Sequence, residues 1–119
     1  MIRKPILVEK EHAQGGNGTA YNYCIATEEE LLGAARLYAR VVLPPGASVG
    51  VHTHTGETEP YYILKGTGMF TEPDGSVVEV HEGDCCIIEP GQSHGIANES
   101  DEDLEFMALI YFDHSKKSH

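Results

Sequence analysis

Residues 46–66 read GASVGVHTHTGETEPYYILKG and contain the pattern that decides the fold. His52 and His54 are two apart in a strand-like run, so both imidazoles project from one face of the strand, with Cα atoms about 6.6 Å apart. Two neutral nitrogen ligands on one face can bind the same ion. After a short turn, Glu59 lies where an antiparallel return strand would bring its carboxylate back beside the histidines. The segment therefore predicts a metal site with nitrogen and oxygen ligands.

A His-x-His pair alone is a weak signal, because histidines on a strand face are often solvated or bonded to the backbone. Residues 83–98, GDCCIIEPGQSHGIAN, supply a second cluster with the same order of strand, turn and strand. His94 opens the return strand of this cluster, as Glu59 does in the first. We therefore expect the two segments to be equivalent hairpins of one closed sheet.

The rest of the chain has the periodicity of a β protein. Apolar residues alternate with other residues along 35–43, and a Pro-Pro-Gly turn follows. One helical signal competes, a capping box from Thr27 to Glu30, which predicts at most one short helix. Many short strands with turns between them predict an all-β sandwich or barrel. The expected strands are 21–26, 35–43, 48–53, 61–64, 67–71, 77–80, 85–88 and 104–112.

In the spacing of both clusters, the sequence resembles the cupins. The first cupin motif has Gly, five residues, His-x-His, three or four residues, Glu, six residues and Gly; the second has Gly, five residues, Pro-x-Gly, two residues, His, three residues and Asn. The matching residues are Gly46, His52, His54, Glu59 and Gly66 for the first motif, and Gly83, Gly91, His94 and Asn98 for the second. Glu89 stands where the family usually has its first proline.

The resemblance implies a double-stranded β-helix, or jelly roll, formed by one cupin domain over residues 1–119. It also implies a single divalent metal held inside the barrel by His52, His54, Glu59 and His94, and a homodimer. Mixed nitrogen and oxygen ligands do not discriminate sharply among first-row metals. The resemblance favours manganese or iron, and zinc, nickel or copper stay open. The glycines and Asn98 are expected to shape turns.

The resemblance implies a metal-dependent enzyme, an oxidoreductase, decarboxylase or isomerase, acting on a small oxygen-rich substrate such as a dicarboxylate, 2-oxo acid or sugar derivative. The alternative is a barrel that binds a carbohydrate or carboxylate without turnover, because cupins host both enzymes and non-enzymes. Two residues are candidate proton carriers: Glu57 in the turn, and Tyr61, which shares the inward parity of Glu59. A solvated Glu57 and a purely structural Tyr61 are the simpler alternatives.

Other polar residues are expected to have structural or surface roles. Arg36 and Arg40 share a strand face, where they either bind a substrate carboxylate or, as we favour, pair with acidic neighbours across the sheet. Residues 15–18, Gly-Gly-Asn-Gly, are expected to form a plain flexible loop and not a phosphate-binding one. No role is expected for the remaining histidines, His12, His81, His114 and His119.

Composition limits the partners and the compartment. The 119 residues have the size of one domain, and eight basic against nineteen acidic residues give a formal charge of −11, which disfavours nucleic acid and anionic membranes as partners. The N-terminus has no signal-peptide pattern. The chain has three cysteines, an odd number, and two of them, Cys85 and Cys86, are adjacent. We therefore expect reduced thiols in a cytoplasmic protein.

Overall fold

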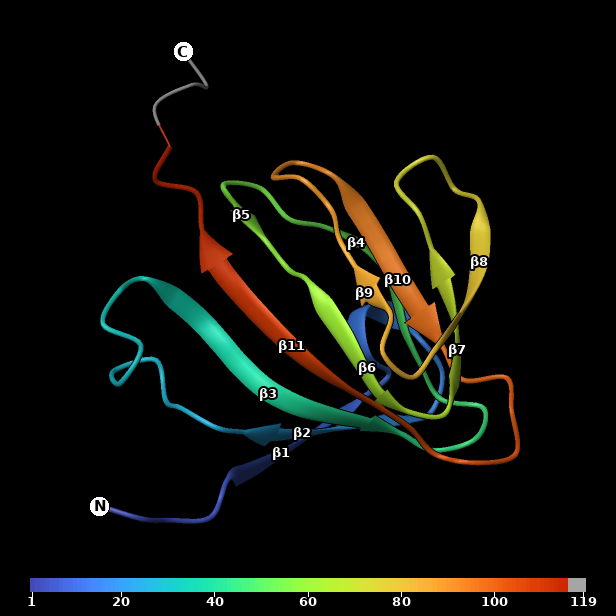
Figure 1. The fold of residues 1–119 in the computed structure, drawn as a ribbon, viewed down its shortest axis with the longest axis horizontal. Helices are drawn as coiled ribbons and strands as arrows, with labels where there is room; N and C mark the ends of the chain where they lie inside the picture. Colours follow the sequence, from blue (N-terminus) through green and yellow to red (C-terminus); the bar gives the residue numbers. More distant parts are fainter. Residues whose placement is uncertain (116–119) are drawn as a thin grey trace.

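The computed structural model describes residues 1–115, which form two antiparallel sheets packed face to face (Figure 1). The seven-stranded sheet has the order β1-β2-β3-β11-β6-β9, with β5 also paired to β11, and the four-stranded sheet has the order β4-β10-β7-β8. One 3-10 turn, η1, spans Ala13–Gly15. The strands are β1 Ile6–Glu11, β2 Thr19–Cys24, β3 Ala35–Leu43, β4 Ser48–Thr53, β5 Glu57–Thr58, β6 Tyr61–Lys65, β7 Thr67–Thr71, β8 Val77–His81, β9 Cys85–Cys86, β10 Ser93–Ala97 and β11 Leu104–Phe112.

The two sheets bury their facing sides in one core. Alternate residues of the two longest strands, β3 and β11, point inward, so Leu43 and Leu104 are completely buried and pair across the strands. Phe70 and Ile96 pair in the same way from the opposite sheet. This alternation is the pattern that predicted the strands. The all-β jelly-roll prediction is confirmed.

Most predicted strands are present, and four have the predicted bounds: 35–43, 48–53, 67–71 and 104–112. Two strands, β1 and β5, were missed, and β10 was expected only as the return strand that His94 opens. In β1 all six residues are exposed, so the strand has no buried face to produce an alternating pattern and is held by its pairing with β2. The other missed strand, β5, has only two residues. Cys85–Ile88 was predicted as a strand, but pairing stops at Cys86.

The capping box forms without an α-helix. The Thr27 amide donates to Glu30 Oε1 at 2.9 Å, and the Glu30 amide donates to Thr27 Oγ1 at 3.2 Å. The chain then turns out of the helical conformation at Leu32, with φ 56°, and Gly33, with φ 75°. Across residues 1–115 no α-helix occurs, and none of the described helical segments has the length and apolar character to cross a membrane.

The expectation that each motif is a hairpin was wrong. In the first motif, β4 lies in the four-stranded sheet and pairs with β10, whereas β5 and β6 lie in the opposite sheet and pair with β11. In the second motif, β9 pairs with β6 and β10 pairs with β4 and β7. The chain crosses between the sheets at turns containing Gly56, with φ 73°, and Gly91, with φ 88°. Each motif therefore spans the barrel and contributes to both walls.

The glycine-rich segment after β1, predicted as a plain flexible loop, packs tightly on β4. A Cβ on Gly16 would lie 2.2 Å from the Ser48 carbonyl oxygen, and a Cβ on Gly50 would lie 2.2 Å from the Gln14 carbonyl oxygen. The Ser48 amide also donates to the Asn17 carbonyl at 2.9 Å. These contacts seat η1 beside the strand that carries His52.

Candidate metal centre

The four predicted ligands reach one point from both sheets. His52 in β4 and His94 in β10 are directly paired across the four-stranded sheet. His54 follows the end of β4, where its amide donates to the Gln92 carbonyl at 3.1 Å. Glu59 follows β5 in the opposite sheet, and Thr58 fixes this segment because its hydroxyl donates to the Ile88 carbonyl at 2.8 Å. Glu59 thus meets the histidines across the barrel and not beside them in a hairpin.

The side chains of these residues converge on a single carboxylate oxygen. Glu59 Oε1 lies 3.0 Å from His54 Nε2, 3.0 Å from His94 Nε2 and 3.4 Å from His52 Nε2. His54 Nε2 and His94 Nε2 are 3.2 Å apart. The four ligand atoms all lie within 4.8 Å of one another. His54, Glu59 and His94 are buried.

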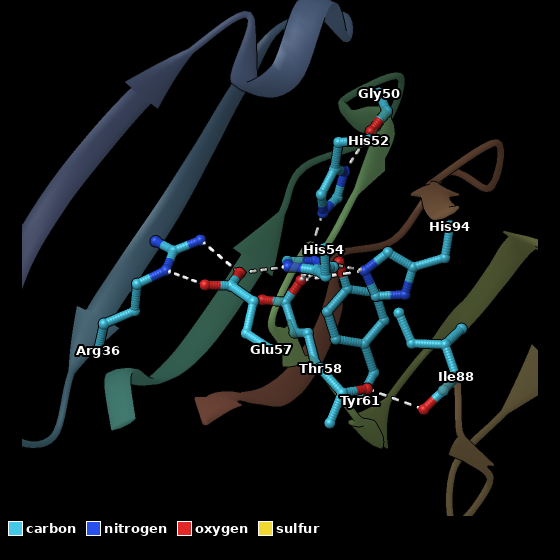
Figure 2. Close-up of polar contacts among 10 residues, drawn as sticks. Arg36, Gly50, His52, His54, Glu57, Thr58, Tyr61, Ile88 and His94 are labelled. Carbon is cyan, nitrogen blue, oxygen red and sulfur yellow. Dashed lines mark hydrogen bonds and ion pairs between the residues drawn. The ribbon is translucent and has the colours of Figure 1, made fainter. Parts of the chain in front are cut away.

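Hydrogen bonds at the far side of two imidazoles fix which ring nitrogen carries a proton (Figure 2). His52 Nδ1 lies 2.7 Å from the Gly50 carbonyl oxygen, which only accepts, so Nδ1 is the donor. His54 Nδ1 lies 2.6 Å from Glu57 Oε2 and donates to that carboxylate. In the neutral rings, both Nε2 atoms therefore present lone pairs to the cluster, as metal ligands must.

Arg36 holds the carboxylate that positions His54. Its Nε and Nη2 atoms each donate to one oxygen of Glu57 at 2.7 Å, in a bidentate ion pair that Figure 2 shows beside His54. Hydrogen bonding to Arg36 is the main cause of a lowered Glu57 pKa, burial opposes it, and the bond to His54 adds to it. Glu57 therefore stays ionised and accepts the His54 proton. Arg36 and Arg40 both pair with acids, as predicted, with Arg40 bound to Glu105 at 2.8 Å.

The charge of Glu59 requires a positive partner. Burial alone would raise the pKa of this carboxyl, but hydrogen bonds that the three imidazoles donate when they are protonated outweigh burial and hold the pKa well below its usual range. The same contact with Glu59 raises the His54 pKa, against the effect of burial. Burial lowers the pKa of His94, although Glu59 opposes this. A buried carboxylate surrounded by imidazoles is stable only with a proton or a metal cation among them.

The spacing of the donors fits a metal ion. Donors held about 2.1 Å from one cation at right angles to each other lie about 3.0 Å apart. The separations from Glu59 Oε1 to His54 and His94 match that spacing. Three imidazole nitrogens and one carboxylate form a donor set that suits first-row divalent metals without selecting one of them.

Tyr61 packs under the cluster. Its ring stacks on His94 with centroids 4.7 Å apart, and its hydroxyl donates to Glu59 Oε1 at 3.2 Å. Burial, with the nearby Glu59 charge, raises the Tyr61 pKa well above its usual value, so the phenol keeps its proton. The inward orientation predicted for Tyr61 is confirmed. The prediction of a solvated Glu57 was wrong, because Glu57 lies in β5 and is only 8% exposed. Whether either residue is catalytic stays a prediction.

A cavity of about 480 Å³ opens from the cluster to the surface. One side carries the ligands, the opposite side is apolar, and the mouth is formed by charged and polar residues of β1, η1 and the turn after β2. His12, expected to have no role, lies at this mouth, where Nδ1 is 3.1 Å from the Gly16 carbonyl oxygen. The sequence carries no local signal for these mouth residues, since strand pairing alone brings them here. The lining residues are Lys10, Glu11, His12, Ala13, Gln14, Ala20, Asn22, Glu28, Arg36, Leu37, Val41, Val49, His52, His54, Glu59, Tyr61, Phe106, Ala108 and Ile110.

The remaining motif residues shape turns, as predicted. Asn98 is buried, and its amide nitrogen donates to the Leu43 and Glu102 carbonyls at 2.8 and 2.7 Å. Glu89, at the unusual position, donates its amide to Gln92 Oε1 at 2.8 Å, a bond that proline could not make. The prediction that His119 has no role concerns a residue outside the described part of the chain. The motif glycines Gly46, Gly66, Gly83 and Gly91 all have positive φ.

Comparison with known families agrees with this geometry. The family model Cupin_2, which describes the cupin domain, matches residues 39–110 and so includes both ligand clusters and more than half of the chain. The chain belongs to the cupin family.

Relatives of this cupin include proteins named for oxalate. The oxalate-binding protein of Thermotoga maritima is 45% identical over 97 residues, which are 82% of this chain and 79% of that protein. A crystal structure described as a predicted oxalate decarboxylase from Thermotoga maritima has a TM-score of 0.87 and 40% identity, covering 92% of this chain and 94% of that chain. A putative sugar phosphate isomerase from Acidithiobacillus ferrooxidans, 20% identical over 78% of this chain and 59% of that chain with a TM-score of 0.67, shares the fold alone.

Proposed function

We propose that this cupin binds one divalent metal, manganese or iron, through His52, His54, Glu59 and His94, and uses it to bind a small carboxylate that chelates through two oxygens. One observation carries the proposal: three imidazole Nε2 atoms lie within 3.4 Å of a single buried carboxylate oxygen at the inner end of a cavity. A six-coordinate metal with four protein ligands keeps two positions for such a ligand. When bound, the metal supplies Lewis acidity toward the oxygens of that ligand.

The ligand class rests on chemistry and on likeness. Two open positions on such a metal would favour a bidentate oxygen ligand, and oxalate is the simplest one. The Thermotoga maritima relative named as an oxalate-binding protein supports the same class. Arg36, which the sequence left as a possible substrate anchor, donates through Nε and Nη2 to the two oxygens of Glu57, so the metal is the main anion site in this proposal.

Binding fits the site better than turnover, because both candidate proton carriers are engaged. Glu57 is bonded to Arg36 and His54, and Tyr61 donates to Glu59. Turnover is the second candidate function, and one contact favours it: the Tyr61 hydroxyl lines the cavity beside the ligand oxygen of Glu59. In that case Tyr61→Phe would remove product formation from oxalate and leave oxalate binding in place.

Calorimetry with oxalate tests the proposal. Protein loaded with Mn²⁺ is expected to bind oxalate, and metal-free protein and the His52→Ala variant are expected not to bind it. His81→Ala is the matched control, because His81 is exposed and bonded only to neighbouring acids. Equal oxalate binding with and without metal would contradict the proposal.

The homodimer and the cytoplasmic location stay predictions. The outer face of the seven-stranded sheet supports a dimer, because Tyr38, Tyr62 and Tyr111 are exposed there on neighbouring strands. Light scattering coupled to gel filtration is expected to give twice the chain mass, and the mass of one chain would contradict the dimer.

A further inference from the structure

The cavity has two chemically different sides. His52 and His54 come from the four-stranded sheet and its adjoining turn, and they face one side of the space, with His94 buried behind them. The opposite side is an apolar wall that we define by Leu37 and Val41 of β3 and Phe106, Ala108 and Ile110 of β11. These residues face each other as cross-strand pairs, Phe106 with Val41 and Ile110 with Leu37.

The apolar wall is far larger than oxalate. From Phe106 to Ile110 the strand advances about 14 Å, at roughly 3.4 Å per residue. Oxalate is only two carboxylates joined by one bond, whereas a cavity of about 480 Å³ lies in the range that accepts drug-sized ligands. Oxalate at the ligand cluster would leave the rest of this cavity to water. The apolar surface that water would meet there comes mainly from Leu37, which is half-buried, because Val41, Phe106, Ala108 and Ile110 are at most 5% exposed.

Small side chains create this space. Ala108 lies at the middle of the wall, and Ala20 of β2 adds a second small side chain to the lining of the same cavity. The neighbouring inward positions carry Val41 and Phe106, which fill their part of the barrel. The hollow therefore comes from particular residues of the chain and lies next to the ligand cluster, since the Phe106 ring is 4.6 Å from the Tyr61 ring.

The mouth offers no dedicated site for a second carboxylate. Lys10 and Arg36 line it together with Glu11 and Glu28, so the formal charges of these described residues cancel. Arg36 is already paired with both oxygens of Glu57. A ligand that extends along the apolar wall toward the mouth thus meets apolar groups and then a charge-balanced rim.

We propose that the natural ligand is a 2-oxo or 2-hydroxy acid with an uncharged hydrocarbon tail. The two oxygens of its head bind at the cluster of His52, His54, Glu59 and His94, and the tail lies on the apolar wall. This inference rests on the proposed function, since the head needs the metal. The inference extends the proposed function beyond oxalate, because it gives the apolar wall the role of binding the hydrocarbon tail.

The test is calorimetry on the full chain loaded with Mn²⁺, with oxalate, pyruvate, 2-oxobutanoate, 2-oxopentanoate and 2-oxohexanoate. From pyruvate onward, each added methylene is expected to lower Kd by about fourfold, the effect of burying one CH₂ group. Equal Kd values along the series, with oxalate still bound, would overturn the inference and leave the proposed function standing. Absence of Mn²⁺ or oxalate binding would overturn both.

A pair of ligands of equal length tests the uncharged tail. 2-Oxopentanoate and 2-oxoglutarate have the same carbon chain, but the second ends in another carboxylate. The apolar wall and the charge-balanced mouth predict tighter binding of 2-oxopentanoate. Tighter binding of 2-oxoglutarate would overturn the uncharged tail.

Two variants locate the effect on the wall. Ala108→Val adds methyl groups to the middle of the wall, and Leu37→Ala removes apolar surface from its outer part. Each is expected to reduce the ratio of oxalate Kd to 2-oxohexanoate Kd by at least about threefold, and the ratio cancels any general loss of metal or head binding. Ala34→Val is the matched control, because Ala34 is exposed and does not line the cavity. An unchanged ratio in Leu37→Ala, with metal content equal to wild type, would overturn the inference.

Discussion

His54 and Glu57 form a hydrogen bond of 2.6 Å between Nδ1 and Oε2, on the side of the imidazole that faces away from the ligand cluster. The bond fixes the proton on Nδ1, so the Nε2 lone pair points at Glu59 and His94. A carboxylate behind a histidine ligand orients the ring and raises its basicity. In this cupin the carboxylate is itself held by Arg36. The side chains of Arg36, Glu57 and His54 therefore form a connected series from the cavity lining to the candidate metal site.

The Glu57→Gln variant tests the series of contacts from Arg36 through Glu57 to His54. The amide keeps an acceptor for His54 but loses the negative charge and the ion pair, so metal affinity is expected to fall by about 10- to 100-fold. Competition with a chelator of known affinity measures the change. Glu79→Gln removes an exposed carboxylate that is bonded to His81 and serves as the control. The same affinity in Glu57→Gln as in wild type would contradict the role of Glu57.

Arg36→Met changes the pH dependence of metal binding. Arg36 is the main cause of the lowered Glu57 pKa, so its loss raises that pKa. A carboxyl with a lowered pKa stays ionised until the pH falls through that low value, and in Arg36→Met protonation begins at a higher pH. Metal binding on the acid side is therefore expected to fail at a higher pH than in wild type. Arg40→Met is the control, because Arg40 pairs with Glu105 away from the cluster. Loss of metal binding at the same acid pH in wild type, Arg36→Met and Arg40→Met would contradict the role of Arg36.

The sequence predicted which four residues lie together, because the resemblance to the cupins rests on their spacing. His52 lies in β4 and His54 directly after it, and the second motif places His94 opposite His52. The contacts by which Arg36 and Glu57 position His54 were harder to predict. Glu57 was placed in a solvated turn, since a strand of two residues leaves no pattern, and its burial depends on pairing with β11, far along the chain.

The path of the backbone from His54 to Glu59 also could not be predicted from the local sequence. A return strand next to β4 was the simplest expectation, yet the chain crosses to the other sheet at Gly56. The same applies to the cavity, whose mouth is made by β1 and η1. The exposed β1 carries no alternating pattern, and the fit of Gly16 against β4 shows only when both segments are in place.

Asn98→Ala is expected to destabilise the fold without altering the ligand set. The substitution leaves the buried Leu43 carbonyl without its side-chain donor, whereas the carbonyl of the exposed Glu102 keeps the Ser100 hydroxyl, so a loss of about 1–3 kcal/mol is expected. Chemical denaturation measures the free energy of unfolding. Asn17→Ala, at an exposed position, is expected to change it by less than about 0.5 kcal/mol. Equal effects of the two substitutions would contradict the structural role of Asn98.

The three cysteines are expected to differ in reactivity. Cys85 is exposed, whereas burial, with nearby Asp84 and Glu72, raises the pKa of Cys86 to about 12. Only thiolates react rapidly with a disulfide reagent, so at pH 8 Cys86 stays protonated and unreactive in the folded protein. Burial also raises the pKa of Cys24, which slows its reaction. Cys85→Ser is expected to remove the fast phase, and a fast phase that persists in this variant would contradict the assignment.

The most direct measurement is the metal content of untagged protein purified without chelators, determined by mass spectrometry for wild type, His94→Ala and His81→Ala. His94 Nε2 lies 3.0 Å from Glu59 Oε1 at the centre of the proposed site, and His81 is an exposed histidine outside it. The account predicts one divalent ion per chain, manganese or iron, in wild type and His81→Ala, and its loss in a folded His94→Ala. Full metal content in His94→Ala, or a folded wild type that neither contains nor takes up metal, would contradict it.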